Sequence, residues 1–184
     1  MERDMILVAI PYHKEKRYAI NHILDWTEQQ THKDIEVIIK FHLGQYGEPG
    51  IIKEQFNHFR DMTLAGNYSH LFIMEADTIP PLDAIDKLLQ ADKDIISLLY
   101  YYRDDSGNPV AWEIESSDYI IKATGGTGTG GLLINSRVLK DNDWNYDQQD
   151  ADWPFMNQLK DKGITPYIHT EVIAKHYKDK ENYS

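Results

Sequence analysis

The chain has 184 residues, a formal net charge of -11 and no cysteine, with 41% hydrophobic and 27% charged residues. This length and composition suit one globular domain. The negative charge argues against a nucleic-acid-binding surface, which needs clustered Lys and Arg. Without cysteine there are no disulfides or thiolate-bound zinc, so Asp, Glu or His must hold any metal. No apolar run approaches the ~20 residues of a transmembrane segment, and no signal peptide is recognisable. We therefore expect a cytoplasmic protein.

The first half of the chain alternates between strand and helix patterns. The continuous apolar run Met5–Ile10, closed by Pro11, predicts a strand buried on both faces. Further along, the patterns predict a helix over 16–30, a strand at 35–39, a turn at 44–50, a helix over 51–65, a strand at 70–74, a helix over 82–90 and a strand at 94–101. Such alternation favours a parallel sheet covered by helices on both faces.

The pattern changes after Tyr102, where the chain becomes rich in loops. A turn-rich loop spans 103–108, short strands are expected at 110–115 and 119–123, and a glycine cluster at 125–131 precedes a strand at 132–134. A helix over 152–162 ends at Gly163, and strand-like segments continue to about Tyr177. No linker separates two domains, so we predict one domain over 1–184, with halves 1–102 and 103–184.

Two acidic residues, Glu75 and Asp77, follow the buried strand at 70–74. Ligands of open α/β sheets bind beyond the carboxyl ends of the strands. The period of two in an extended chain predicts that both carboxylates point to the same side. A hard cation such as Mg²⁺ or Mn²⁺ would relieve their repulsion and could bridge to phosphate oxygens. An equally weighted reading is a pair of solvated turn acids, with Asp77 capping the next helix.

Other matches along the chain occur in the order of a known family. An apolar strand ending in Pro and a polar residue is matched by Val8–Tyr12, and the pattern hhFhDxD by Leu71–Asp77. An Arg-Asn pair in the preceding helix is matched approximately by Arg60-Asp61. A Gly-rich segment before an apolar strand is matched by Thr129–Ile134.

The last matches lie near the C-terminus. Asp152, Phe155 and Gly163 have the spacing of Glu-Asp-x-x-Phe with a Gly eleven residues past the Asp, although Ala151 replaces the Glu, and His176 follows the last strand. Over roughly 5–177 the chain resembles GT-A-fold glycosyltransferases of the inverting, family-2-like group.

The resemblance implies a single GT-A-like (Rossmann-like) α/β domain, with a mixed, mostly parallel sheet and helices on both faces. It implies hexosyl-type transfer from a UDP- or GDP-linked sugar to a carbohydrate or other hydroxyl acceptor, dependent on Mn²⁺ or Mg²⁺. The nucleotide-sugar site would then comprise Pro11, Tyr12, His13, Arg60, Asp61, Glu75, Ala76 and Asp77. The metal ligands would be Asp77, His176 and Glu75.

The acceptor side is implied in the same way. Asp152 would be the general base, with Asp150 as the less favoured alternative. Gly130 and Gly131 would let the backbone approach a sugar or acceptor, and Trp153 would stack on the acceptor. One ring of the run Tyr100–Tyr102 is expected to face the ligand cleft, because the run ends a central strand.

Two departures keep other functions open. The acids that usually hold the nucleobase are missing from Lys40–His42, and Ala151 stands where a Glu is usual. A nucleotidyltransferase would share a related sheet, but usually carries a Gly-rich basic loop after the first strand, and the segment 12–17 has no glycine. A non-catalytic nucleotide- or carbohydrate-binding relative is the other alternative. A dinucleotide-binding role for the glycine cluster is disfavoured, because such a loop should follow the first strand.

Overall fold

The computed structural model describes residues 5–42, 50–104, 106–115, 119–145 and 152–177. The strands are β1 (Ile6–His13), β2 (Ile35–His42), β3 (His70–Ile73), β4 (Thr78–Ile79), β5 (Ile95–Leu99), β6 (Ala111–Glu115), β7 (Ile120–Thr127), β8 (Leu132–Asn135), β9 (Tyr167–Ile173) and β10 (Lys175–His176). The helices are the 3-10 helix η1 (Lys14–Ala19), α1 (Ile20–Gln29), α2 (Ile51–Ala65), α3 (Ala84–Gln90), α4 (Ser136–Leu139) and α5 (Asp152–Asp161).

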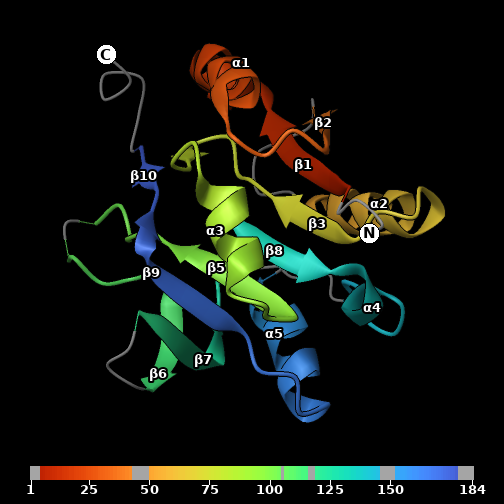
Figure 1. Cartoon of the computed structure of the whole chain (residues 1–184), viewed down its shortest axis with the longest axis vertical. Helices are drawn as coiled ribbons and strands as arrows, with labels where there is room; N and C mark the ends of the chain where they lie inside the picture. Colours follow the sequence, from red (N-terminus) through yellow and green to blue (C-terminus); the bar gives the residue numbers. More distant parts are fainter. Residues whose placement is uncertain (1–4, 43–49, 105, 116–118, 146–151, 178–184) are drawn as a thin grey trace.

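Eight strands form one mixed sheet in the order β2-β1-β3-β8-β5-β9-β7-β6 (Figure 1). The pairs β1–β2, β1–β3 and β5–β9 are parallel, whereas β8 is antiparallel to both of its neighbours, β3 and β5. Strands β2, β1, β3, β5 and β9 therefore run in one direction, and their carboxyl ends share one edge of the sheet. The expected mixed, mostly parallel sheet is confirmed.

Helices cover both faces of this sheet. Ile6, Val8 and Ile10 of β1 pack into a core with α1 and α3. The intervening Leu7 and Ala9 pack into a second core with α2, α4 and α5. Alternate residues of a strand point to opposite faces, so a continuous apolar run fills both cores.

Several predicted boundaries shift. Strand β1 does not stop at Pro11 but continues to His13, paired with β2 along its whole length. Its pairing with β3 ends at Ala9, so one side of Pro11 has no partner strand. Proline is tolerated where its missing N–H faces no partner strand. Helix 51–65 is confirmed with its predicted bounds. The helix expected over 16–30 divides into η1 and α1. Of the turn expected at 44–50, only residue 50 is among the described residues.

A second sheet of two short strands, β4 and β10, lies at the shared carboxyl edge. His176 pairs with Thr78 and Lys175 with Ile79, in an antiparallel ladder. This ladder attaches the end of the chain to the segment that follows β3. Within the described residues, no helix is both long enough and apolar enough to cross a membrane.

Candidate metal and donor site

The acidic pair lies on a turn, not on an extended strand. β3 ends at Ile73, and the amide of Thr78 donates to the carbonyl of Glu75 over 3.0 Å. The prediction that a strand period of two aligns the two carboxylates is therefore wrong in its reason. The turn instead brings Glu75 and Asp77 to one side, because it reverses the chain between them.

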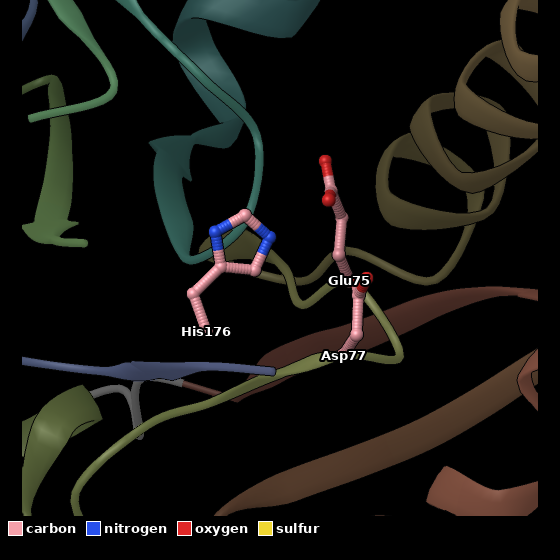
Figure 2. A group of neighbouring side chains, drawn as sticks. All are labelled: Glu75, Asp77 and His176. Atoms are coloured by element: carbon pink, nitrogen blue, oxygen red, sulfur yellow. The ribbon is translucent and has the colours of Figure 1, made fainter. Parts of the chain in front are cut away.

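The C-terminal segment brings a histidine to this turn. His176 lies opposite Thr78 in the β4–β10 ladder, and the amide of Tyr177 donates to the carbonyl of Asp77 over 2.9 Å. One side-chain donor atom from each of Glu75, Asp77 and His176 lies within 4.8 Å of the others. Figure 2 shows the three side chains, which come from the turn after β3 and from β10. The residues predicted as metal ligands are thus brought together.

The imidazole of His176 is prepared for a ligand. Its Nδ1 lies 2.8 Å from the carbonyl oxygen of Tyr101, which can only accept, so Nδ1 carries the proton. Burial lowers the pKa of His176, against the raising effect of that hydrogen bond, and keeps the ring neutral. Nε2 is buried without a hydrogen-bond partner in the structure and retains its lone pair. A carbonyl that orients an imidazole in this way is a usual second contact of metal-binding histidines.

The donor set therefore fits a divalent cation. Two carboxylates and one neutral imidazole offer hard or borderline ligands, which suit Mn²⁺ or Mg²⁺ with water or phosphate oxygens completing the shell. The arrangement supports a metal-binding group at Glu75, Asp77 and His176.

Thr129 joins Glu75 to Asp152. The Thr129 Oγ1 atom lies 2.9 Å from Glu75 Oε1 and 2.9 Å from Asp152 Oδ1, and the Thr129 amide donates to Asp152 Oδ2 over 3.2 Å. A hydroxyl donates only one hydrogen, so the second carboxyl completes the arrangement best when it carries a proton. Burial, followed by the charges of Asp152 and Asp77, raises the pKa of Glu75 to about 7. Of the two carboxyls, Glu75 is accordingly the one that holds this proton in the metal-free protein below about pH 7.

Asp77 is buried, at 2% exposure, and carries two cationic partners. Arg103 Nη2 lies 2.8 Å from Asp77 Oδ2, and Lys16 Nζ contacts the same oxygen. Lys16 comes from η1, directly after β1, and Arg103 from the segment after β5. The carboxyl ends of two different strands thus supply positive charge to one carboxylate.

A pocket of about 560 Å³ opens beside these groups. It is lined by Glu75, Tyr100, Tyr102, Arg103, Asp104, Val110, Asp152 and His176. The expectation that a ring of the tyrosine run faces the cleft is confirmed. Burial raises the pKa of Tyr100 well above its usual range, so its phenol stays neutral beside the acids.

The residues predicted at the end of β1 lie at the same sheet edge but contact η1 and β2, and they are not among the residues that line the pocket. His13 Nδ1 accepts from the amide of Glu15 over 3.2 Å and caps η1. Tyr12 is buried and meets the ring of Phe41 edge-on at 4.9 Å, and the imidazoles of His13 and His42 lie 5.7 Å apart. Pro11 directly precedes Tyr12, in the part of β1 that pairs only with β2.

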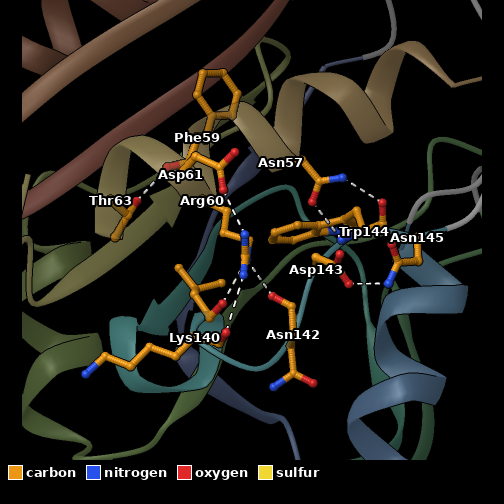
Figure 3. Close-up of polar contacts among 11 residues, drawn as sticks. Asn57, Phe59, Arg60, Asp61, Thr63, Lys140, Asn142, Asp143, Trp144 and Asn145 are labelled. Atoms are coloured by element: carbon orange, nitrogen blue, oxygen red, sulfur yellow. Dashed lines mark hydrogen bonds and ion pairs between the residues drawn. The ribbon is translucent and has the colours of Figure 1, made fainter. Parts of the chain in front are cut away.

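Arg60 and Asp61 do not belong to the site, which corrects their predicted role. The Arg60 Nε atom donates to the carbonyls of Leu139 and Asn142, and its Nη1 pairs with Asp61 at 2.7 Å (Figure 3). Helix α4 follows β8 at Asn135, which is opposite His70 at the start of β3. Arg60 therefore ties α2 to the sheet edge opposite the acidic turn.

Gly130 and Gly131 pack closely against β5 and Tyr100, while their predicted contact with an acceptor stays a prediction. A Cβ at Gly130 would lie 2.8 Å from the ring of Tyr100, and a Cβ at Gly131 would lie 2.4 Å from Leu98. Both glycines are buried, and the Gly130 amide donates to the Tyr100 hydroxyl over 3.0 Å. The glycines allow the chain to pass close to β5 and Tyr100, which hold one wall of the pocket.

The predicted acceptor residue Trp153 lies beside the proposed base at the start of α5. It is 43% exposed and meets Trp112 edge-on, with ring centroids 5.5 Å apart. Ala76, predicted within the nucleotide-sugar site, is buried at 4% exposure inside the turn. Asp150, the alternative base, and Ala151 lie outside the described residues.

Sequence reasoning missed Lys16, Arg103 and Thr129 as site residues. The first two follow the carboxyl ends of β1 and β5, so the rule that singled out Glu75 and Asp77 could have found them. Thr129 is hidden in the glycine cluster, where no local pattern marks one hydroxyl above another.

The chain matches no protein-family model and no curated protein sequence. Among solved structures it is similar to A197 from STIV, with a TM-score of 0.66 and 18% identity over 95% of this chain and 86% of that chain. It is also similar to S. aureus TarS, with a TM-score of 0.60 and 11% identity over 92% of this chain and 36% of that one. The inositol-1-phosphate CTP transferase from T. maritima gives a TM-score of 0.59 at 10% identity, over 100% of this chain and 94% of that chain.

At this level of identity the similarity concerns the fold. The chain has the α/β fold that glycosyltransferases of the GT-A type share with nucleotidyltransferases. The fold by itself assigns neither chemistry to this chain.

Proposed function

We propose that this protein transfers a sugar from a nucleoside-diphosphate sugar to a hydroxyl acceptor, with inversion and with Mn²⁺ or Mg²⁺. One observation carries the proposal: Asp152 is held by Thr129 within a hydrogen-bond chain that also includes Glu75 of the metal-binding group. A carboxylate held in this position is suited to accept a proton, and the neighbouring group of Glu75, Asp77 and His176 is suited to hold an ion that binds a diphosphate.

The roles follow from the positions. Asp77, His176 and Glu75 would hold the ion, which supplies charge stabilisation to the leaving diphosphate. Asp152 takes the hydrogen of the acceptor hydroxyl. The acceptor oxygen forms a bond to the anomeric carbon, and the bond from that carbon to the diphosphate oxygen breaks, with the electron pair leaving on the diphosphate. Attack opposite the leaving group inverts the anomeric centre.

The acceptor side is proposed to lie at the exposed face of Trp153. An indole edge or face beside the general base suits the apolar face of a carbohydrate ring, and Trp112 meets this indole edge-on. The nucleobase of the donor is proposed to lie near the ends of β1 and β2, beside the neighbouring imidazoles of His13 and His42. In this proposal residues 1–102 supply most of the donor site, to which His176 adds a metal ligand, and residues 103–184 bind the acceptor.

Nucleotidyl transfer is the second candidate, because the T. maritima structure named above is a CTP transferase with the same fold. The two reactions leave different products. Sugar transfer or slow hydrolysis releases a nucleoside diphosphate from a nucleotide sugar, whereas nucleotidyl transfer releases pyrophosphate from a nucleoside triphosphate. A panel of nucleotide sugars and triphosphates with Mn²⁺, analysed by chromatography for both products, tests the proposal.

Thr129→Val should lower kcat by about ten- to a hundredfold while leaving the KM for the donor sugar nearly unchanged. Valine keeps the volume of the buried side chain but removes the hydroxyl that aligns Asp152. Steady-state kinetics check this, and Thr129→Ser is the matched control because it retains the hydroxyl. A valine variant as active as the serine variant would show that the hydroxyl does not position the base.

Glu75→Gln should stabilise the metal-free protein above neutral pH. The pKa of Glu75 rises from 4.5 to about 7 on folding, so the folded state holds the extra proton and loses stability as the pH rises through that range. Between about pH 5 and about pH 8, the free energy of unfolding of the wild type should fall by on the order of 2 kcal/mol more than that of the variant. Denaturant unfolding with a chelator, at about pH 5 and about pH 8, measures it. Equal pH dependence in both proteins would contradict the buried proton.

A further inference from the structure

Lys16 and Arg103 have no role yet in the proposed reaction, although both lie at its centre. Their charged ends meet at one oxygen, Oδ2 of Asp77, whose side chain is 4% exposed. The Lys16 side chain is only 14% exposed, and Arg103 is 33% exposed and lines the pocket. Two long cationic side chains are therefore concentrated on a carboxylate that also belongs to the metal-binding group.

A divalent cation cannot share that oxygen with both side chains. A metal–oxygen bond of about 2.1 Å would place two positive charges beside the ammonium and guanidinium groups. An ion that binds this oxygen therefore competes with Lys16 and Arg103 for it, because Coulomb repulsion at such separations is strong where water is excluded.

The displaced cations have a natural new partner. That partner is a diphosphate. The pocket is acidic, because Glu75, Asp104 and Asp152 also line it and its carboxylates outnumber Lys16 and Arg103. An incoming diphosphate adds further negative charge and needs cations that are not already bound to carboxylates. A guanidinium fork and a flexible ammonium are the two side chains best suited to phosphate oxygens.

We propose that Lys16 and Arg103 form a diphosphate-binding pair that exchanges with the metal ion. In the metal-free protein they neutralise Asp77, and when the ion takes this carboxylate they turn to the phosphate oxygens of a nucleoside diphosphate. The proposal rests on the proposed function, from which it takes the ion and the diphosphate. The exchange makes the ion and the nucleotide bind cooperatively. The ion frees Lys16 and Arg103 for the nucleotide, and the nucleotide frees Asp77 for the ion.

Lys16→Met and Arg103→Met test this exchange through two affinities of opposite sign. Calorimetric titration with MnCl₂ alone should show Mn²⁺ bound at least about fivefold tighter than by wild type, because no ion pair must break. Titration with UDP and with GDP in saturating Mn²⁺ should show binding at least about tenfold weaker, because a charge-assisted contact is lost. Lys14→Met removes the same charge from the exposed side of η1 and should change neither affinity.

The possible failures are distinguishable. If wild type binds Mn²⁺ but the two variants bind it no tighter, or bind nucleoside diphosphates no more weakly, the exchange is wrong and the proposed function stands. If Mn²⁺ binds more weakly to Lys16→Met, the lysine supports the metal site instead of competing with it, and the exchange is also wrong. If wild type binds no Mn²⁺ at all, the exchange and the metal-dependent function both fail.

Discussion

Asp152→Asn is expected to reduce sugar transfer by about a thousandfold while donor binding stays within about twofold of wild type. The asparagine oxygen can still accept from Thr129, so the side chain keeps its place but cannot take a proton from the acceptor hydroxyl. Turnover by product chromatography and donor affinity by calorimetry measure the two effects.

Two further variants sharpen this result. Asp161→Asn changes the same residue type at the exposed far end of α5 and should leave turnover unchanged. Asp150→Asn tests the alternative base and should retain most of the activity. Retention of more than about a tenth of wild-type turnover in Asp152→Asn, with loss in Asp150→Asn, would assign the base to Asp150.

Asp77→Asn should abolish metal-dependent nucleotide binding, with a loss of at least about a hundredfold in affinity for UDP or GDP in the presence of Mn²⁺. The amide is nearly isosteric with the carboxylate but provides no charge for the ion, and it leaves Lys16 and Arg103 without their common anion. Calorimetry of nucleoside diphosphates with Mn²⁺, and again with a chelator, measures the loss.

The matched control is Asp83→Asn, which removes a carboxylate that precedes α3 and pairs with Lys87 away from the acidic turn. It should bind nucleotide as wild type does. Unchanged, Mn²⁺-dependent affinity in Asp77→Asn would remove this residue from the metal site and leave the acidic turn as a structural feature.

The sheet was predictable because its strands are short apolar runs that alternate with helical patterns. The runs around Ile6–Ile10 and His70–Ile73 need burial on both faces, and only a sheet with two helical layers offers that. Gly163 was recognisable as a helix end for a local reason, whereas Phe155 was singled out by its place in the family pattern. Phe155 stacks on Trp144 at 4.0 Å in the core, and Gly163, with a φ of 73°, ends the turn after α5.

The site was predictable only in part, because its residues depend on contacts that are distant in sequence. The pairing of His176 with Thr78 places the imidazole, and nothing local in either segment indicates that pairing. Arg60 was wrongly assigned to the site, because it lies in the helix before the strand that leads to the acidic turn, as in the family pattern. Its guanidinium instead binds carbonyls at the other edge of the sheet. The packing of Gly131 against Leu98 could not be predicted, because the bulk of Leu98 beside it is visible only in three dimensions.

The central claim is that the group around Glu75, Asp77 and His176 serves sugar transfer. The most direct measurement is product analysis after incubation with UDP- and GDP-sugars, with Mn²⁺ and with a chelator. The account predicts slow, Mn²⁺-dependent release of nucleoside diphosphate and free sugar, absent in Asp77→Asn. Release of pyrophosphate from nucleoside triphosphates without turnover of any nucleotide sugar, or no turnover and no Mn²⁺-dependent binding, would contradict it.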